Sequence, residues 1–451
     1  MDQRRTVPFV VMCAGMFFVL LDVTIVNVAL PSIGRGTGAA HVADLQWVID
    51  GYQLTLAGLL LAGGTLGDRY GHRRVVTAGF VLFGLASAAC ALAPGIGALV
   101  AARVVQGVGA ALLLPGTLAV ITTLYPERER RARAIGAWAA IGSLALPAGP
   151  VVGGLLVQAL GWRWVFWINV PVVAVVIVAV LVTVRESAPE RRPLDVLGML
   201  LGTATLGLVT FAVIEAGRYG PTAPPVLASG TLALISGACF VVAERRQAHP
   251  MVPLALLRHP PIAVSTVVAG TMNFGINGVM LLLTLYLQAV QHRSPVEAGL
   301  SLLPLFLPLV LLPAYAGRLT GRHGPKPVML AGLGLLVAGF LLLLLVRPWS
   351  GYGPLFPAML VIGVGAALLT PSVVALAMGA APPGREGLTS ALNNTARQAG
   401  GAVGVAALGA VGGDPARPAA FVSGLHHAAW VAAVAYACAG LLTLLTRQAD
   451  A

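Results

Sequence analysis

The stretch Gly64–Arg74, GTLGDRYGHRR, joins two long apolar segments and packs one acid, three arginines and three glycines into eleven residues. Glycines allow two helix ends to approach closely and allow the backbone to take left-handed turns. The carboxylate of Asp68 is placed to meet a neighbouring helix N-terminus, while Arg69, Arg73 and Arg74 suit an anionic membrane leaflet. The stretch therefore predicts a tight turn between two membrane helices.

A related pattern returns at Gly317–Lys326, GRLTGRHGPK, 253 residues further along the chain. An internal repeat of this length in a membrane protein indicates two related halves. Gly321 stands in the repeat where the first copy has Asp68. We therefore expect two similar helix bundles, of which only the first carries an acid in this loop.

Composition places the chain in a membrane. Of its 451 residues, 58% are hydrophobic and only 10% are charged, against about 25% charged in a soluble domain. Met1–Arg5 precedes an apolar run, as in a signal peptide, but no small-residue cleavage site follows and Asp22 interrupts the run, so we expect a retained first helix. The four cysteines and the histidines form no metal-binding spacing, and we expect no metal and no other cofactor.

Apolar runs near the roughly 20 residues that span a bilayer occur fourteen times. They lie at about 8–30, 45–66, 75–93, 97–120, 134–157, 164–184, 196–216, 224–243, 262–287, 297–316, 327–346, 353–378, 388–411 and 426–446. The prediction is an all-α integral membrane protein with fourteen transmembrane helices in a 6 + 2 + 6 layout. Residues 1–186 would form an N-terminal six-helix bundle, 187–250 two linker helices and 251–451 a C-terminal six-helix bundle.

The distribution of positive charge sets the expected orientation. Twenty of the 28 Lys and Arg residues fall on the side of the termini, six fall on the opposite side and two lie within spans. By the positive-inside rule, both termini are expected in the cytoplasm. The same placement, in loops at a membrane surface, argues against nucleic acid as the partner of this +12 chain.

Three ionisable residues fall within predicted spans at one depth. At 1.5 Å per residue, Asp22 and Arg103 each lie about 9 Å from the outer face, and Asp50 lies about 8 Å from it. Burial disfavours the charge of a carboxylate and a nearby arginine favours it, and these opposed effects allow proton exchange near neutral pH. We predict proton coupling at Asp22, Arg103 and Asp50. A purely structural Asp22–Arg103 ion pair and a solvated Asp50 are the alternatives.

Gly142, Ala145, Gly149 and Gly153 recur at three- and four-residue spacings and form a smooth face on the fifth predicted span, and Gly154 lies in the same run. Pro150, in the same run, removes a backbone donor and bends the helix. Small residues let helices approach closely, so packing alone is one explanation of this face and a role in transport is the other.

Further polar residues lie within the spans. Asn27 and Gln106 follow Asp22 and Arg103 in the first and fourth spans, and three polar residues form an i, i+3/i+4 group near the inner end of the thirteenth span: Asn393, Asn394 and Arg397. All five are candidates for the lining of a substrate cavity. For Arg397, snorkelling to the headgroups is an equal alternative.

These motifs carry a family resemblance. Gly64–Arg74 resembles the loop signature between helices 2 and 3 of the major facilitator superfamily, and the pattern Gly-Pro-x-x-Gly-Gly at 149–154 looks like the antiporter signature of its exporters. Leu21–Pro31 and Gly161–Pro171 resemble hallmarks of the fourteen-helix drug:proton antiporter family. Ser294–Gly299 and Asn393–Gln398 match the second half of that family, so the resemblance covers nearly the whole chain.

Two departures accompany the resemblance. Ala145 stands where the antiporter signature usually has glycine, and Gly321 replaces the acid of the repeated loop. In the family the acid of helix 1 and the arginine of helix 4 are implicated in proton coupling, which maps to Asp22 and Arg103. The first loop is implicated in gating, with a solvated basic turn as the alternative; here it offers Gly64, Asp68, Arg69, Gly71, Arg73 and Arg74.

The resemblance implies a monomeric exporter in the cytoplasmic membrane of a bacterium, working by alternating access and drawing on the proton-motive force. We expect small amphipathic substrates, neutral or anionic, because the last six predicted spans contain no Asp or Glu that could pair with a buried cation, apart from Glu297 at a loop edge. The alternatives are a proton-coupled uptake symporter and a non-transporting receptor or membrane enzyme. The symporter would have no use for the signature at 149–154, and the chain shows no nucleophile–base motif.

Overall fold

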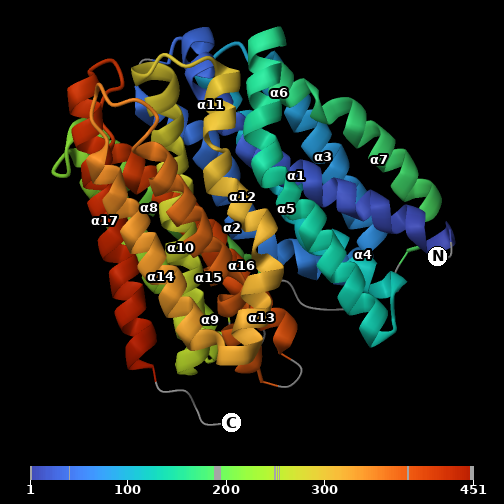
Figure 1. Ribbon diagram of the computed structural model, residues 1–451. Helices are drawn as coiled ribbons and strands as arrows, with labels where there is room; N and C mark the ends of the chain where they lie inside the picture. The colour runs from blue at the N-terminus through green and yellow to red at the C-terminus, as the bar shows by residue number, and fades with distance from the viewer. Residues whose placement is uncertain are drawn as a thin grey trace. The chain divides into compact units, whose positions relative to one another are not determined.

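The computed structural model describes residues 3–39, 41–186, 195–247, 250, 252, 254–382 and 385–446. All regular elements in these ranges are helices (Figure 1). The chain divides into two compact units, which are described separately. Unit 1 comprises residues 1–40, 47–203 and 294–299, and unit 2 comprises residues 41–46, 204–293 and 300–451.

Unit 1 is built from the helices of the first half of the chain. These are α1 (Gln3–Thr37), most of α2 (Val42–Tyr70), α3 (His72–Leu92), α4 (Ile96–Leu124), α5 (Arg128–Leu160), α6 (Trp164–Trp167), α7 (Asn169–Thr183) and the start of α8 (Val196–Tyr219). Helix α1 packs most extensively on α5, α3 packs on α4, and α7 lies against both α1 and α3. A shared core of aliphatic and aromatic side chains joins them, with Phe80 and Phe83 of α3 fully buried.

Unit 2 repeats this pairing with later helices. It contains the rest of α8, α9 (Pro224–Arg246), α10 (Pro260–Leu285), the end of α11 (Pro295–Ser301), α12 (Leu303–Leu311), α13 (Pro313–His323), α14 (Pro325–Leu342), α15 (Leu355–Gly379), α16 (Glu386–Val411) and α17 (Pro418–Leu445). Here α10 packs on α16, α14 packs on α15, and α17 lies against α14 and α10. The predicted internal repeat is therefore present as one helix arrangement built twice.

The repeated loop also has the same backbone in both copies. Gly71, between α2 and α3, has a φ angle of 96°, and Gly324, between α13 and α14, has a φ angle of 80°. A residue with a side chain is strained in this left-handed region, so each tight connection depends on its glycine. The two glycines are 253 residues apart, the offset read from the sequence.

Eleven helices in the described ranges are long and apolar enough to cross a membrane, and a twelfth span results if the bent pair α12 and α13 counts as one. Helices α2 and α16 coincide with two further predicted spans but fall outside this set. Their polar residues explain this: Gln46, Asp50 and Gln53 in α2, and Asn393 and Arg397 in α16. The protein is thus a multi-pass membrane protein, and the figure of fourteen spans stays a prediction.

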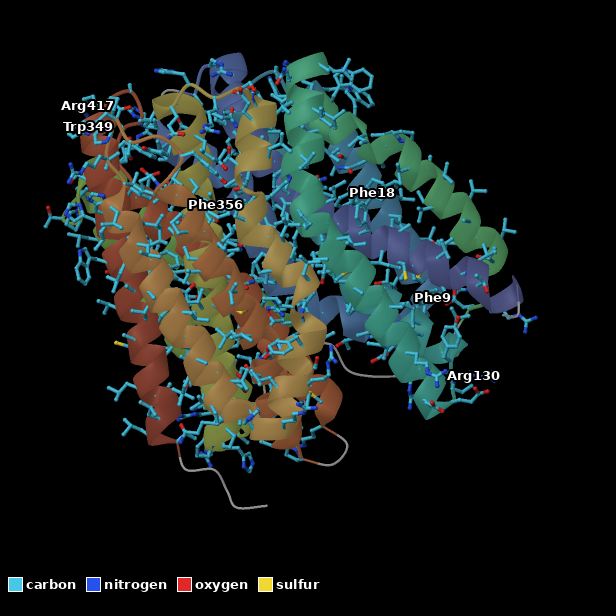
Figure 2. The ribbon with its side chains drawn as sticks, in the orientation of Figure 1. Phe9, Phe18, Arg130, Trp349, Phe356 and Arg417 are labelled. Carbon is cyan, nitrogen blue, oxygen red and sulfur yellow. The ribbon has the colours of Figure 1, made fainter. Side chains whose placement is uncertain are left out.

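Connections in unit 2 carry exposed polar and aromatic residues at one end. Trp349 lies between α14 and α15 and Arg417 immediately precedes α17, and both are strongly exposed. Figure 2 places them together at one end of the unit. Both fall in loops that the charge distribution assigns to the outer side of the membrane.

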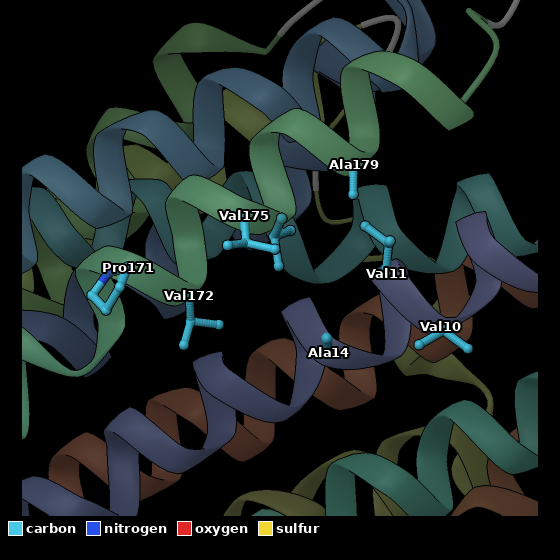
Figure 3. A pocket seen from close by; sticks show the side chains of 8 residues that line it. Val10, Val11, Ala14, Pro171, Val172, Val175 and Ala179 are labelled. Atoms are coloured by element: carbon cyan, nitrogen blue, oxygen red, sulfur yellow. The ribbon is translucent and has the colours of Figure 1, made fainter.

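A lateral cavity of about 440 Å³ lies between α1 and α7 of unit 1. The view in Figure 3 shows Val10, Val11 and Ala14 of α1 facing Val172 and Ala179 of α7 across it. All eight lining side chains are apolar. The cavity therefore has no group that could bind or move a proton.

Close packing of α1 on α5 depends on glycine at two positions. A methyl group at Gly149 would collide with the side chain of Thr24, and one at Gly153 would lie 2.9 Å from the carbonyl oxygen of Ile25. The hydroxyl of Thr24 also donates to the carbonyl oxygen of Ala145, at 3.2 Å. The exporter-type signature therefore has at least a packing role in this conformation.

Replacing Gly149 with alanine is expected to destabilise unit 1, because overpacking of a tight interface costs about 1–3 kcal/mol. Gly136, on the same helix, is the matched control, since a methyl group there meets no atom within 4 Å. We expect Gly149→Ala to lower the thermal unfolding midpoint of the purified protein in detergent, and Gly136→Ala to leave it unchanged or raise it. Equal midpoints for the two variants would show that the contact does not constrain the fold.

Candidate functional site

The centre of unit 1 holds a buried ion pair. The carboxylate of Asp22 on α1 accepts a hydrogen bond from the guanidinium of Arg103 on α4, through Oδ2 and Nη1. Both side chains are shielded from solvent, with 0% and 1% of their surface exposed. The structure thus brings together two residues that the sequence placed at one depth from separate spans.

Further donors engage the second oxygen of Asp22. The side-chain amides of Gln106 on α4 and Asn169 at the start of α7 donate to Oδ1, at 3.0 and 3.1 Å. Gln106 in turn accepts from Arg103 at 2.8 Å. The structure shows Gln106 inside the ion-pair network, and its predicted contact with substrate stays a prediction.

Arg103 is held on its other side by α2. Its Nε donates to the carbonyl oxygen of Val48 at 3.0 Å, and its guanidinium lies 4.3 Å from the centre of the Tyr52 ring. A cation over an aromatic face is attracted to it, more strongly when both are desolvated. The Asp22–Arg103 ion pair is therefore held in place by further contacts to both of its residues.

Two residues of the network were not assigned a role from the sequence. Ser87 on α3 accepts from Asn169 at 3.0 Å and donates to the carbonyl oxygen of Phe166 at 2.9 Å. Asn169 and Ser87 are both buried. A polar residue in the middle of an apolar span was the available signal, since such groups in a membrane seek partners.

These contacts leave the charge on Asp22 well compensated. A carboxylate with a cationic partner and two amide donors meets the condition under which burial of an ion pair is tolerated. Contacts from α1, α2, α3, α4 and α7 meet here, so the network also ties five helices together. Its geometry favours the structural alternative for Asp22 in this conformation.

Asp50 on α2 has a different environment. Its side chain has no exposed surface, and neither carboxylate oxygen has a hydrogen-bond partner among the described residues. Gln53, one turn further along, is also buried, and its Oε1 likewise has no partner in the described part of the chain. The predicted common depth is consistent with the contact from Arg103 to Val48, but Asp50 lies outside the network.

The remaining cavity candidates belong to separate units, Asn27 to unit 1 and the other three to unit 2. Asn27 donates to the carbonyl oxygen of Val23 in its own helix at 2.8 Å, and Asn393 donates to the carbonyl oxygen of Ser265 on α10 at 3.2 Å. Asn394 is exposed and Arg397 is partly exposed. Their contact with substrate stays a prediction.

Charged residues of the first loop make specific contacts. Asp68 lies 3.3 Å from Nε2 of His72, the first residue of α3, and its contact with the backbone of a helix N-terminus stays a prediction. The backbone amide of Arg73 and the side chain of Arg74 both meet the carboxylate of Glu186, at 3.1 and 3.6 Å. Arg69 lies 5.4 Å from the ring centre of its neighbour Tyr70. A methyl group at Gly64 would lie 3.6 Å from Cβ of Pro115, an ordinary van der Waals distance.

A cation binds a helix C-terminus in each copy of the loop. Arg73 donates to the carbonyl oxygen of Leu181 at the end of α7, at 2.8 Å. Lys326, 253 residues later, donates to the carbonyl oxygens of Leu444 and Thr446 at the end of α17, at 3.0 and 2.9 Å. Terminal carbonyls of a helix lack intrahelical donors and attract cations. The two copies of the loop therefore share this contact between a cation and the last carbonyl groups of a helix.

The end of the exporter-type signature packs on the start of α11. This first part of α11 belongs to unit 1. A methyl group at Gly154 would lie 2.5 Å from the carbonyl oxygen of Pro295, and one at Gly299 would collide with the carbonyl group of Pro150. Backbone therefore meets backbone without intervening side chains. Both predicted motifs, at 149–154 and 294–299, form a single contact.

Metal binding finds no support in the described ranges, where no three His, Cys, Asp or Glu side chains form a group that could hold an ion.

A comparison with protein families matches residues 12–405 to the Major Facilitator Superfamily. The chain belongs to this superfamily. It is accordingly a transporter and not an enzyme.

Several relatives of this chain carry resistance names. The chain is 37% identical to the multidrug resistance protein Stp of Mycobacterium tuberculosis, over 91% of this chain and 76% of that protein. It is 36% identical to the methylenomycin A resistance protein of Streptomyces coelicolor, over 90% and 86%. The puromycin resistance protein pur8 of Streptomyces alboniger is 36% identical, over 98% and 90%.

Solved transporters share the fold at low identity. An auto-inhibited POT family peptide transporter superposes with a TM-score of 0.73 at 14% identity, over 99% of this chain and 98% of that one. The human organic anion transporter MFSD10 superposes with a TM-score of 0.65 at 17% identity, over 98% and 100%. These likenesses support the fold of the transporter family and nothing finer.

The ion pair predicts a double-mutant result. Arg103→Gln leaves the buried carboxylate of Asp22 without its cation, which costs about 3–5 kcal/mol. Combining it with Asp22→Asn removes the stranded charge, so the double variant should regain part of the lost thermal stability in detergent. A double variant that is less stable than Arg103→Gln would contradict the network described above.

The first loop predicts an asymmetry between the two copies. Asp68→Asn removes the carboxylate that contacts the imidazole of His72, whereas a side chain at Gly321, its counterpart, would meet no atom within 4 Å. We expect Asp68→Asn to slow transport far more than Gly321→Asp at matched membrane expression. Equal and large losses would point to a loop that works symmetrically in both units.

Proposed function

We propose that this protein is a proton-coupled antiporter of the fourteen-helix drug:proton type, exporting small amphipathic organic molecules across the cytoplasmic membrane of a bacterium. Export would proceed by alternating access with both termini in the cytoplasm and would draw on the proton-motive force without a bound cofactor. The observation that carries the proposal is the joint occurrence of a buried, charged polar network with relatives named for multidrug and antibiotic resistance.

Coupling is assigned to Asp22, Arg103 and Asp50. The two acids have opposite surroundings, one with a cation and two amide donors and one with no donor among the described residues. Ionisable groups inside membrane spans are the usual carriers of protons in transporters. The loop of Gly64–Arg74 is assigned to gating on its contacts with His72, Glu186 and the end of α7.

Transport direction separates this proposal from proton-coupled uptake. In everted membrane vesicles, an imposed gradient with an acidic interior should drive a resistance-type substrate such as puromycin into the vesicle lumen. The same gradient would drive substrate out of vesicles preloaded with it if the protein were a symporter. A protein that moves no candidate substrate in either direction would contradict export of drugs.

The preferred substrates are proposed to be neutral or anionic, and the protein to act as a monomer. Asp22 is already paired with Arg103, so it offers no free counter-charge to a cation. A resistance panel in a host without its own pumps should show protection against neutral and acidic antibiotics. Protection against dicationic biocides alone would mean that another acid binds the substrate.

A further inference from the structure

The structure assigns the exchanged proton to Asp50 and a permanently charged, structural role to the Asp22–Arg103 pair. This inference rests on the proposed proton antiport and divides the work between the two acids. It departs from the simpler expectation that the acid of helix 1 is itself the proton carrier. The argument starts from the hydrogen-bond partners of each carboxylate.

Both carboxylate oxygens of Asp22 already accept hydrogen bonds in the conformation described. Its two oxygens receive Arg103, Gln106 and Asn169, and protonation would put a hydrogen where these donors already point. A proton on Asp22 would also leave the Arg103 cation buried without its counter-ion. Removing one charge of a buried pair is costly, so a cycle that titrates Asp22 must first take the network apart.

Asp50 is in the reverse position. Its side chain has 0% exposure, and both oxygens lack any hydrogen-bond partner within the described part of the chain. An ionised carboxylate without donors is strongly disfavoured in a low dielectric, and such a group takes up a proton instead. Asp50 therefore has the surroundings of an acid that holds a proton, and water or a donor has to reach it before the proton leaves.

No described side chain forms a hydrogen bond with Asp50. The charged groups in contact with its stretch of α2 are Arg103 on α4, which binds Val48 and Tyr52, and Asp22, which binds Arg103. Arg103 is committed to Asp22, Gln106 and the carbonyl oxygen of Val48. None of these groups forms a hydrogen bond or an ion pair with Asp50.

Gln53 supplies a local reason for a proton at this place. It lies three residues after Asp50, so the two side chains share one face of α2. Its Oε1 is a buried acceptor with no donor among the described residues. A protonated Asp50 carries an O–H group that can donate a hydrogen bond, and an ionised Asp50 has none. Protonation therefore places one donor beside acceptors that otherwise have no donor.

The proton step needs no other reactant. A proton from water on the outer side forms an O–H bond with the Asp50 carboxylate, and the neutral acid is then buried. When water enters from the cytoplasmic side, that O–H bond breaks and the proton leaves to water. The Asp22–Arg103 pair keeps its net charge of zero throughout and holds α1, α2 and α4 in register.

The test compares Asp50→Asn with the wild type in vesicles that contain the purified protein. Two readouts are used: uptake of labelled substrate driven by a pH gradient, and counterflow of labelled against unlabelled substrate at equal pH. We expect Asp50→Asn to lose the pH-driven component down to the level of empty vesicles while retaining counterflow. Asp50→Glu, which keeps a titratable group, should restore a pH response.

Asp44→Asn is the matched control, because it makes the same substitution on the same helix at a partly exposed acid that pairs with Arg218. It should respond to the gradient as the wild type does. If Asp50→Asn keeps a wild-type pH response, or loses only cationic substrates while neutral ones stay coupled, the assignment is wrong. If the wild type itself shows counterflow but no pH response, the proposed proton antiport fails first.

Discussion

The ion pair between Asp22 and Arg103 is the constraint on which the rest of unit 1 depends. Two charges in the interior of a membrane protein are tolerated only when each is paired and hydrogen-bonded, and here α2, α3 and α7 supply the remaining partners. Because each partner comes from a different helix, the requirement fixes how these helices pack. The need to pair two buried charges therefore constrains the packing of the helices throughout unit 1.

A second consequence concerns the acid that the network leaves out. Asp50 is buried without a donor on a helix whose neighbouring residues, Val48 and Tyr52, contact Arg103 directly. Movement of α2 relative to this cation would therefore change the surroundings of Asp50 while the ion pair stays intact. Such an arrangement gives coupling a physical basis: one group holds charge and structure, and its neighbour exchanges the proton.

Sequence reasoning reached the parts of this account that depend on local pattern or on depth. The glycine turn at Gly71, its repeat at Gly324 and the meeting of Asp22 with Arg103 follow from motif, offset and helical rise. Ser87 and Asn169 could not be identified in the same way, because one serine or asparagine in an apolar span does not reveal which helix it will face. The missing donors around Asp50 are likewise visible only after the side chains are placed. The same holds for the hydrogen bonds of Gln106 to Asp22 and Arg103.

The most direct test of the division of labour is the infrared absorption of the two acids themselves. A protonated carboxyl group absorbs separately from an ionised one, so a pH-difference spectrum of the protein in lipid counts the acids that titrate. This account predicts a protonated-carboxyl band that disappears in Asp50→Asn and remains in Asp44→Asn and Asp22→Asn. A band that persists in Asp50→Asn and is lost in Asp22→Asn would contradict it.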